Sequence, residues 1–222
     1  MQSDFLQSLR AVVDAEWAAI KTGPFHRRIM EGTVTRALYR EMMMQVYHYT
    51  RHNATNQAVT AFVEAPEKLL KFVFRHAAEE LGHERMALRD LQSVDLFRDS
   101  DLAQPLLPAT EALIGYLYSV ALRYGPVPRL GYSFWAEGSY VYIDGWLKKI
   151  AQDLSLGKEQ MTFFSSHIQA DVGHMAQVEA CLKEFVTTPQ QQAQVTTVAR
   201  TTLFLTGQLL DQVALRHPQE PA

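Results

Sequence analysis

The sequence predicts an all-α protein, a single-domain bundle of seven or eight helices that spans residues 1–222. Apolar side chains recur every three to four residues along nearly every long segment, and no segment alternates like a strand for more than a few residues. The 222 residues include only 11 glycines and 9 prolines, too few for an architecture built mainly of loops. No repeat or linker divides the chain, and its length suits one domain.

Turn residues delimit the first three expected helices. Gly23-Pro24 closes a helix over residues 3–20, and a short turn follows. A continuous helical pattern then predicts one long helix over residues 35–64. Pro66 stands where proline favours a helix start, and the pattern after it runs to about residue 94.

Four further helices are expected after residues 95–107, the least regular segment of the chain. Their expected ranges are 108–124, 127–154, 158–186 and 189–216. Pro108 and Pro189 each begin one of these helices. Gly125 and Gly157 follow the ends of the first two, as glycine commonly does after a helix.

Composition excludes several classes of protein. The 21 basic and 24 acidic residues give a net charge of −3, without the basic excess that nucleic acids or anionic membranes attract. A single cysteine, Cys181, excludes an internal disulfide and any cysteine-rich zinc or iron–sulfur site. No apolar run approaches the ~18 residues of a membrane span, and the first residues do not read as a signal peptide. We therefore expect a cytoplasmic protein that binds neither nucleic acid nor membrane.

Metal-type ligands occupy the middle of the apolar stripe predicted for residues 158–186. His167, Asp171 and His174 follow one another at spacings of four and three, between Phe164 and Val178. These spacings place the three side chains on one helical face, about one turn apart.

The helix predicted after Pro66 has the same arrangement. His76, Glu80 and His83 interrupt its apolar stripe, and Glu79 lies beside them. Glu80 and His83 have the Glu-x-x-His spacing by which di-metal helical bundles supply a carboxylate and an imidazole.

Two other helices carry polar residues on their apolar stripes. In the helix expected after Gly125, Glu137 and Asp144 lie on the stripe, so we expect one or two buried carboxylates there. In the helix expected over residues 35–64, Gln45, His48 and His52 are similarly spaced.

The number of these ligands favours a metal site. A lone histidine on an apolar stripe is usually a core residue with a hydrogen-bond partner, but here six of the eight histidines form three same-face pairs. Burying Glu80, Glu137 and Asp171 without a cation would be costly, and we expect no lysine or arginine on these stripes. A divalent metal would supply the missing charge, and mixed carboxylate and imidazole ligation suits iron or manganese.

Three segments carry a resemblance to a known family: HAAEELGHERMALRDL (76–91), LGYSFWAEG (130–138) and HIQADVGH (167–174). They resemble the heme-oxygenase-like diiron oxidases and oxygenases, whose fold is shared with heme oxygenase, TenA and pyrroloquinoline-quinone synthase. The resemblance covers residues 24–186 and implies a heme-oxygenase-like helical bundle. Its most specific part is His-x-x-x-Asp-x-x-His.

The resemblance also implies a ligand set. The implied metal ligands are Glu80, His83, Glu137, His167, Asp171 and His174. Many members add a carboxylate from the early helix, near Tyr47 here, where this chain offers Gln45, His48 and His52 instead. His76 stands where some relatives place a glutamate. Additional ligands or neighbours of the ligands would come from His48, His52, His76, Glu79 and Asp144.

The implied activity is that of a non-heme iron oxidase or oxygenase. Its implied cofactor is Fe(II), as two ions, with manganese as the other metal to consider, and O2 is the co-substrate. The implied substrate is a small organic molecule, amino-acid-like or fatty-acid-like, and an external electron donor is a further partner. Weaker expectations are a homodimer and substrate binding by Arg51, Arg123, Arg129 and Tyr140.

Other interpretations stay open from the sequence. A metal-independent oxidase resembling pyrroloquinoline-quinone synthase would use His83 and His174 as general acid and base. A non-enzymatic helical protein would bind a ligand or a partner helix. Two branches of the fold fit less well, because Cys181 lies on an apolar stretch rather than at a TenA-type nucleophile position, and His26 follows the first helix instead of lying on it as a heme ligand.

Overall fold

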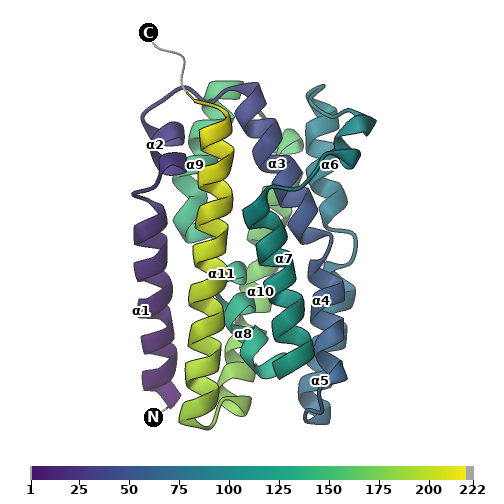
Figure 1. The fold of residues 1–222 in the computed structure, drawn as a ribbon, viewed down its shortest axis with the longest axis vertical. Coiled ribbons are helices and arrows are strands. Elements are labelled where there is room, and N and C mark those ends of the chain that lie inside the picture. The colour runs from purple at the N-terminus through teal and green to yellow at the C-terminus, as the bar shows by residue number, and fades with distance from the viewer. Residues whose placement is uncertain (1, 219–222) are drawn as a thin grey trace.

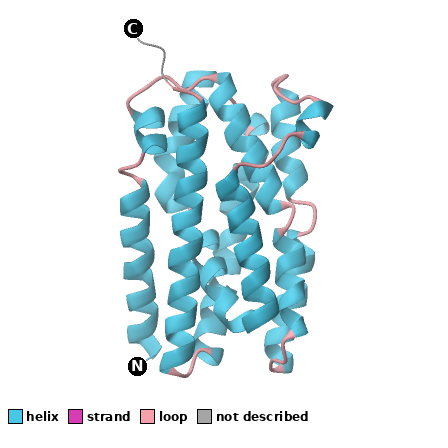
Figure 2. Ribbon diagram, in the orientation of Figure 1, coloured by secondary structure: helices cyan, strands magenta, loops and turns pink. Residues whose placement is uncertain are grey.

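The computed structural model describes residues 2–218, with all their side chains except those of residues 2, 3 and 167–172. This part of the chain consists of helices and loops without a strand, which confirms the all-α prediction (Figure 2). Its α-helices are α1 (Gln2–Ile20), α2 (Pro24–Met30), α3 (Arg36–Thr50), α4 (Asn53–Val59), α5 (Glu67–Glu80), α6 (Glu84–Ser93), α7 (Pro108–Tyr124), α8 (Pro126–Glu137), α9 (Tyr140–Leu154), α10 (Thr162–Phe185) and α11 (Pro189–Arg216). Short 3₁₀ helices cover Thr60–Phe62, Asp99–Ala103 and Lys158–Gln160.

Most helices run along the long axis of the molecule, up or down (Figure 1). The long α11 packs against α1, α2, α7 and α8. The short α8 also packs against α10, α7 and α5, so it lies at the centre of the bundle. Gly131 allows α8 and α11 to meet closely, because a Cβ at this position would lie 2.1 Å from the carbonyl oxygen of Val195.

Polar side chains fix several helix starts. Thr35 caps α3 by accepting a hydrogen bond from the backbone N–H of Leu38. Asp90, buried in α6, accepts hydrogen bonds from the backbone N–H groups of Thr162 and Phe163 at the start of α10. The sequence-distant helix α10 is thereby tied to α6.

Three of the long helices expected from the sequence are each broken into two. The helix expected over residues 35–64 is interrupted at residues 51–52, the one after Pro66 at residues 81–83, and the one after Gly125 at residues 138–139. The bundle accordingly has eleven α-helices within residues 2–218, more than the seven or eight expected. At the second break Gly82 has a φ of 94°, which favours glycine and ends the helix.

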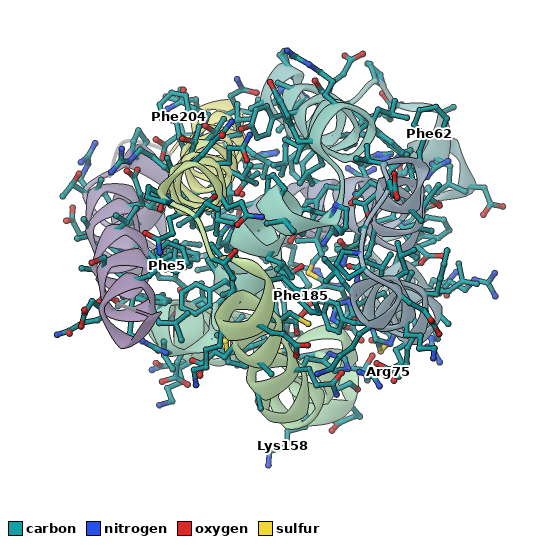
Figure 3. All side chains as sticks on the ribbon, turned by 90° about the horizontal axis from the view of Figure 1, so that it is seen from below. Phe5, Phe62, Arg75, Lys158, Phe185 and Phe204 are labelled. Carbon is teal, nitrogen blue, oxygen red and sulfur yellow. The ribbon has the colours of Figure 1, made fainter. Side chains whose placement is uncertain are left out.

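Most large apolar side chains of the described residues share one core. Exceptions lie at the edge of the molecule, where Phe62 and Phe204 are 79% and 56% exposed (Figure 3). None of the described helices combines the length and the apolar character that crossing a lipid bilayer requires.

Candidate metal centre

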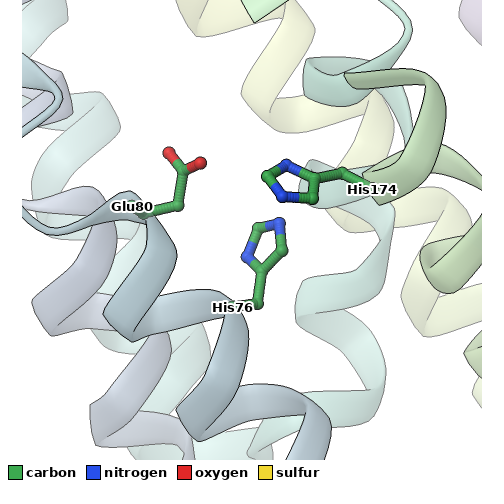
Figure 4. Close-up of side chains that lie close together, drawn as sticks. All are labelled: His76, Glu80 and His174. Atoms are coloured by element: carbon green, nitrogen blue, oxygen red, sulfur yellow. The ribbon is translucent and has the colours of Figure 1, made fainter. Parts of the chain in front are cut away.

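Residues from three helices and one turn converge at the centre of the bundle. His76 and Glu80 come from α5, Glu137 ends α8, His174 comes from α10, and His83 lies in the turn between α5 and α6. One ligand atom from each of His76, Glu80 and His174 lies within 4.8 Å of the others. These three side chains point toward one another from two sides of the site (Figure 4).

His76 is fixed at both of its ring nitrogens. Its side chain is 1% exposed. Nδ1 lies 3.0 Å from the Oε1 of Gln57, whose amide nitrogen in turn donates to the backbone carbonyl of Val73. Gln57 therefore presents an acceptor, so Nδ1 carries hydrogen, and Nε2 faces the Oε1 of Glu137 at 3.0 Å. Metal-binding histidines are commonly oriented in this way, with one nitrogen donating to an oxygen and the other free to bind.

Glu137 lies between two imidazoles. Its Oε2 is 3.4 Å from the Nδ1 of His174, and its Oε1 faces His76. Burial alone would raise the pKa of Glu137, but hydrogen bonding from His174 and His76 holds that pKa down to about 2. The carboxylate is therefore ionised at every ordinary pH.

His174 faces carboxylates on both sides. Its Nε2 is 3.3 Å from the Oε2 of Glu79, opposite the nitrogen that faces Glu137. Hydrogen bonding to Glu137 raises the pKa of His174 to about 9, against the opposing effect of burial. Without a metal, protons on the imidazoles thus balance part of the negative charge.

Glu80 and His83 form a second pair beside this group. The prediction that both residues lie on one helical face is wrong, because α5 ends at Glu80 and His83 lies beyond it. The turn at Gly82 nevertheless returns His83, and its Nδ1 lies 3.4 Å from the Oε1 of Glu80. Burial raises the pKa of Glu80, but the contact with His83 outweighs it and lowers that pKa overall. Asn53 donates to the other oxygen, Oε2, at 3.0 Å.

A buried arginine lies behind this pair, contrary to the expectation that the stripes hold no cation. Arg129 is 2% exposed and donates to the Oδ1 of Asn53, the Oδ1 of Asn56 and the Oγ of Ser133, at 2.7, 2.8 and 2.8 Å. Burial lowers its pKa to about 10, which still leaves it charged at neutral pH. These contacts use three of its five N–H donors within the protein, so they favour a structural role over the substrate-binding role expected for it.

The donor set still fits iron. Glu80 and Glu137, whose side chains are each 9% exposed, supply two carboxylates against one buried guanidinium, and His76, His83 and His174 supply imidazoles. Carboxylate and imidazole ligands are typical of non-heme iron sites. A ligand histidine commonly donates a hydrogen bond through its other ring nitrogen, as His76 does to Gln57. Two of the expected ligands, His167 and Asp171, lie outside the described side chains, so the set on α10 is described only for His174.

Other residues expected near the site lie elsewhere. Asp144 is on the surface of α9 and pairs with Lys148, because the break at residues 138–139 turns it away from the stripe that ends at Glu137. His48 is buried in α3, and its Nδ1 has no hydrogen-bond partner among the described residues. His52 lies 3.2 Å from the hydroxyl of Tyr118. Neither histidine belongs to the cluster of described ligands.

The polar residues that surround the ligands were not expected from the sequence. Asn53, Asn56 and Gln57 all come from α4, and the last two are 1% and 2% exposed. Three amide side chains within the segment NATNQAV were the available signal, because buried amides need fixed partners.

A cavity of about 450 Å³ adjoins the cluster. Its lining includes Arg10, Phe134, Glu137, Tyr140 and Tyr142. A smaller cavity, about 100 Å³, is lined by residues that include both Glu80 and Glu137. Of the residues expected to bind substrate, Tyr140 lines both cavities, whereas Arg51 and Arg123 are exposed and line neither.

Comparison with known proteins identifies both the fold and a family. The model of a family described as iron-containing redox enzymes matches residues 40–207, and no curated protein matches. A solved domain of unknown function with a heme oxygenase-like fold, from Shewanella denitrificans, is 42% identical, with a TM-score of 0.93 over 96% of this chain and 93% of that one. A TenA homologue from Pseudomonas syringae is 12% identical (TM-score 0.77, 96% and 93% covered), and heme oxygenase from Leptospira interrogans is 17% identical (0.70, 94% and 98%). The heme-oxygenase-like fold expected from the resemblance is confirmed.

Proposed function

Because the chain belongs to the family of iron-containing redox enzymes, we propose that it is a non-heme iron oxidase or oxygenase. It would use O2 to oxidise a small organic substrate, and two Fe(II) ions would form its centre. The observation that carries this proposal is the convergence of the buried His76 and Glu80 with His174, and the contacts that Glu137 and His83 make with them.

Each ligand would have a separate task. The carboxylates of Glu80 and Glu137 would bind the iron and balance its positive charge. The histidines would bind the iron through ring nitrogens; they are His76, His83 and His174. Ferrous iron held there would supply electrons for the reduction of O2. Among the residues outside the described side chains, His167 and Asp171 are the proposed additional ligands from α10.

The chain's own residues set the protonation state of the site. Gln57 accepts from the Nδ1 of His76, so Nε2 is the nitrogen that faces Glu137 and would bind the metal. The proton held between His174 and Glu137 would leave when a cation binds, because metal ligands bind in their deprotonated form.

The substrate would occupy the cavity of about 450 Å³ beside Glu137. A volume of this size is within the usual range for small-molecule sites. Its aromatic wall favours a molecule with an apolar body, consistent with an amino-acid-like or fatty-acid-like substrate.

Anaerobic Fe(II) titration followed by O2 uptake tests the proposal. We expect iron to bind tightly and O2 to be consumed when it is admitted. Glu137→Gln should lose both properties because it removes a ligand charge between the two imidazoles. Asp144 was expected on the same apolar stripe as Glu137 but is exposed. Asp144→Asn should therefore keep iron binding and O2 consumption.

Two results would contradict the proposal. One is a wild-type protein that binds no iron, and the other is a Glu137→Gln variant that binds iron as the wild type does. Oxidation of a substrate by protein stripped of iron would instead support the metal-independent interpretation, with His83 and His174 as acid and base.

A further inference from the structure

All three tryptophans of the chain lie together with one tyrosine. The ring of Trp17 stands 6.1 Å from that of Trp135, and 6.1 Å from that of Trp146. On its other side Trp17 stacks on Tyr142, with centroids 5.2 Å apart and an interplanar angle of 7°. α1, α8 and α9 supply these rings, so helices distant in sequence meet in one aromatic cluster.

The cluster begins at the candidate metal centre. Trp135 precedes Glu137 by two residues and lines the cavity of about 100 Å³ that Glu80 and Glu137 also line. Tyr132, which lines the same cavity, has its ring centroid 5.2 Å from that of Trp135. A continuous series of rings therefore runs outward from the cavity that the two carboxylates line.

The cluster ends where the protein meets solvent. Tyr142 is partly exposed and lines the cavity of about 450 Å³, and the ammonium of Lys21 lies 5.7 Å from its ring. Its hydroxyl donates a hydrogen bond to the carboxylate of Asp14, an exposed residue of α1.

The hydrogen bonds of the rings differ in a way that matters for electron transfer. The indole N–H of Trp17 is buried and has no acceptor among the described residues, and that of Trp135 donates to the hydroxyl of Thr202. Neither indole thus faces a base that would take its proton after oxidation. Tyr142 does, because Asp14 is a carboxylate. If one of these rings lost an electron, the tryptophans would transfer the oxidation to Tyr142. Tyr142 would lose its proton to Asp14 and become a neutral radical.

We propose that Trp135, Trp17 and Tyr142 form an electron route between the metal centre and the surface. The inference rests on the proposed function, since an oxidised iron centre is the electron acceptor. In this reaction Tyr142 would lose one electron, its phenolic proton would move to Asp14, and oxidised iron held at the centre would accept the electron. The products are a neutral tyrosyl radical and a protonated Asp14 carboxyl.

A small one-electron reductant of the thiol or ascorbate class would restore the resting state. It would transfer one electron to the Tyr142 radical, and the proton would return from Asp14 to the phenol oxygen. The route would then supply electrons to the centre, or remove oxidising equivalents from it, when no substrate is present.

Trp146 offers a competing end point. Its indole N–H donates to the Nδ1 of His26 at 3.0 Å, so this ring also faces a base. Tyr142 is favoured because it stacks in parallel on Trp17 and reaches solvent, whereas Trp146 is 5% exposed and inclined to Trp17 by 61°.

The test is rapid freeze-quench electron paramagnetic resonance on Fe(II)-loaded protein mixed with O2 in the absence of substrate. We expect a tyrosyl radical whose hyperfine pattern changes when tyrosine is ring-deuterated. Tyr142→Phe and Trp17→Phe should abolish it, and Asp14→Asn should lower its yield. Tyr124→Phe, which changes an exposed tyrosine outside the cluster, should leave it unchanged. Iron oxidation is followed in the same samples by Mössbauer spectroscopy.

Separate outcomes distinguish the two proposals. Iron that is not bound or not oxidised by O2 would overturn the proposed function and this inference with it. Iron that is oxidised without a tyrosyl radical, or with the same radical in Tyr142→Phe, would overturn the electron route alone. A radical that responds to tryptophan deuteration and is lost in Trp146→Phe would also overturn it. Since Asp14 is on the surface, Asp14→Asn retains a folded variant even if Trp17→Phe disturbs packing.

Discussion

Gln57 determines which nitrogen of His76 is available to a ligand. Its amide nitrogen donates to the carbonyl of Val73, which turns its oxygen toward the Nδ1 of His76. That contact leaves Nε2 directed at Glu137, inside the site. Gln57, which is not itself an expected metal ligand, thus fixes the orientation of the ligand His76.

Arg129 supports the site through Asn53. It holds the amide oxygen of Asn53, so the amide nitrogen faces Glu80. We expect Arg129→Lys to lower the free energy of unfolding by about 2 kcal/mol, because lysine retains the charge but cannot reach three acceptors in a fixed fork. Urea denaturation measures this change. The exposed Arg123→Lys is the matched control and should stay within about 0.5 kcal/mol of the wild type; equal effects of both substitutions would refute the structural role of Arg129.

Cys181 should react slowly with alkylating reagents. Burial, followed by the charge of Glu184, raises the pKa of its thiol from 9.0 to about 11. At pH 8 the thiolate fraction, and with it the rate of iodoacetamide labelling, should be about 100-fold lower in the folded protein than in urea. The folded-state rate should rise with pH up to about 11. Rapid labelling at pH 7 would instead indicate an activated thiol of the kind a TenA-type nucleophile needs.

At the level of elements, the ends of the helices were more predictable than their interruptions. The last helix, Pro189–Arg216, has the predicted limits, because a proline marks its start. The breaks at residues 51–52, 81–83 and 138–139 were missed, since the apolar stripe continues on both sides of each. Gly82 and Gly138 were possible signals for two of these breaks, but glycine also occurs inside helices of this chain, as Gly131 and Gly145 do.

The same breaks limit how much of the site could be predicted. Glu80 and Glu137 are each the last residue of a helix, and Asn53 is the first residue of another. Spacing along one helix could identify the residue types, but not that Asp144 turns to the surface or that Arg129 approaches Asn53. Those contacts depend on how separate helices pack, which local periodicity does not encode.

The packing of α8 on α11 depends on Gly131. We expect Gly131→Ala to lower the free energy of unfolding by at least about 2 kcal/mol, because the added Cβ would meet the backbone oxygen of Val195. Gly145→Ala is the matched control. Its added Cβ meets nothing within 4 Å, and alanine favours a helix, so it should stabilise by up to about 1 kcal/mol. Thermal denaturation of both variants decides the point, and a neutral Gly131→Ala would mean that the helices are less closely packed than described.

At the scale of the whole molecule, the site joins parts of the chain that are far apart in sequence. α5, α8 and α10 each contribute at least one residue to it, and Asn53 and Gln57 of α4 contact the two residues that α5 contributes. A shared heme-oxygenase-like fold does not by itself select an activity, as the TenA homologue and the heme oxygenase of the same fold illustrate. The chemistry therefore has to be argued from the ligands.

Metal binding should couple to the stability of the whole bundle. Fe(II) would bind only the folded site. A free Fe(II) concentration of 100 times the dissociation constant should therefore raise the free energy of unfolding by about 2.7 kcal/mol. For a chain of this size that corresponds to a rise in Tm of roughly 5–10 °C. Anaerobic calorimetry with and without Fe(II) measures the shift, and a chelator should reverse it. A similar shift in Glu137→Gln would show that iron binds elsewhere.

The most direct test of the account is the position of iron. Crystals grown anaerobically with Fe(II) would be measured on both sides of the iron absorption edge, and the anomalous difference map would locate the metal. We predict two peaks within bonding distance of the group formed by His76, Glu80, His83, Glu137 and His174. Iron only at surface carboxylates such as Asp144, or no anomalous peak between α5, α8 and α10, would contradict the assignment of this cluster as the metal centre.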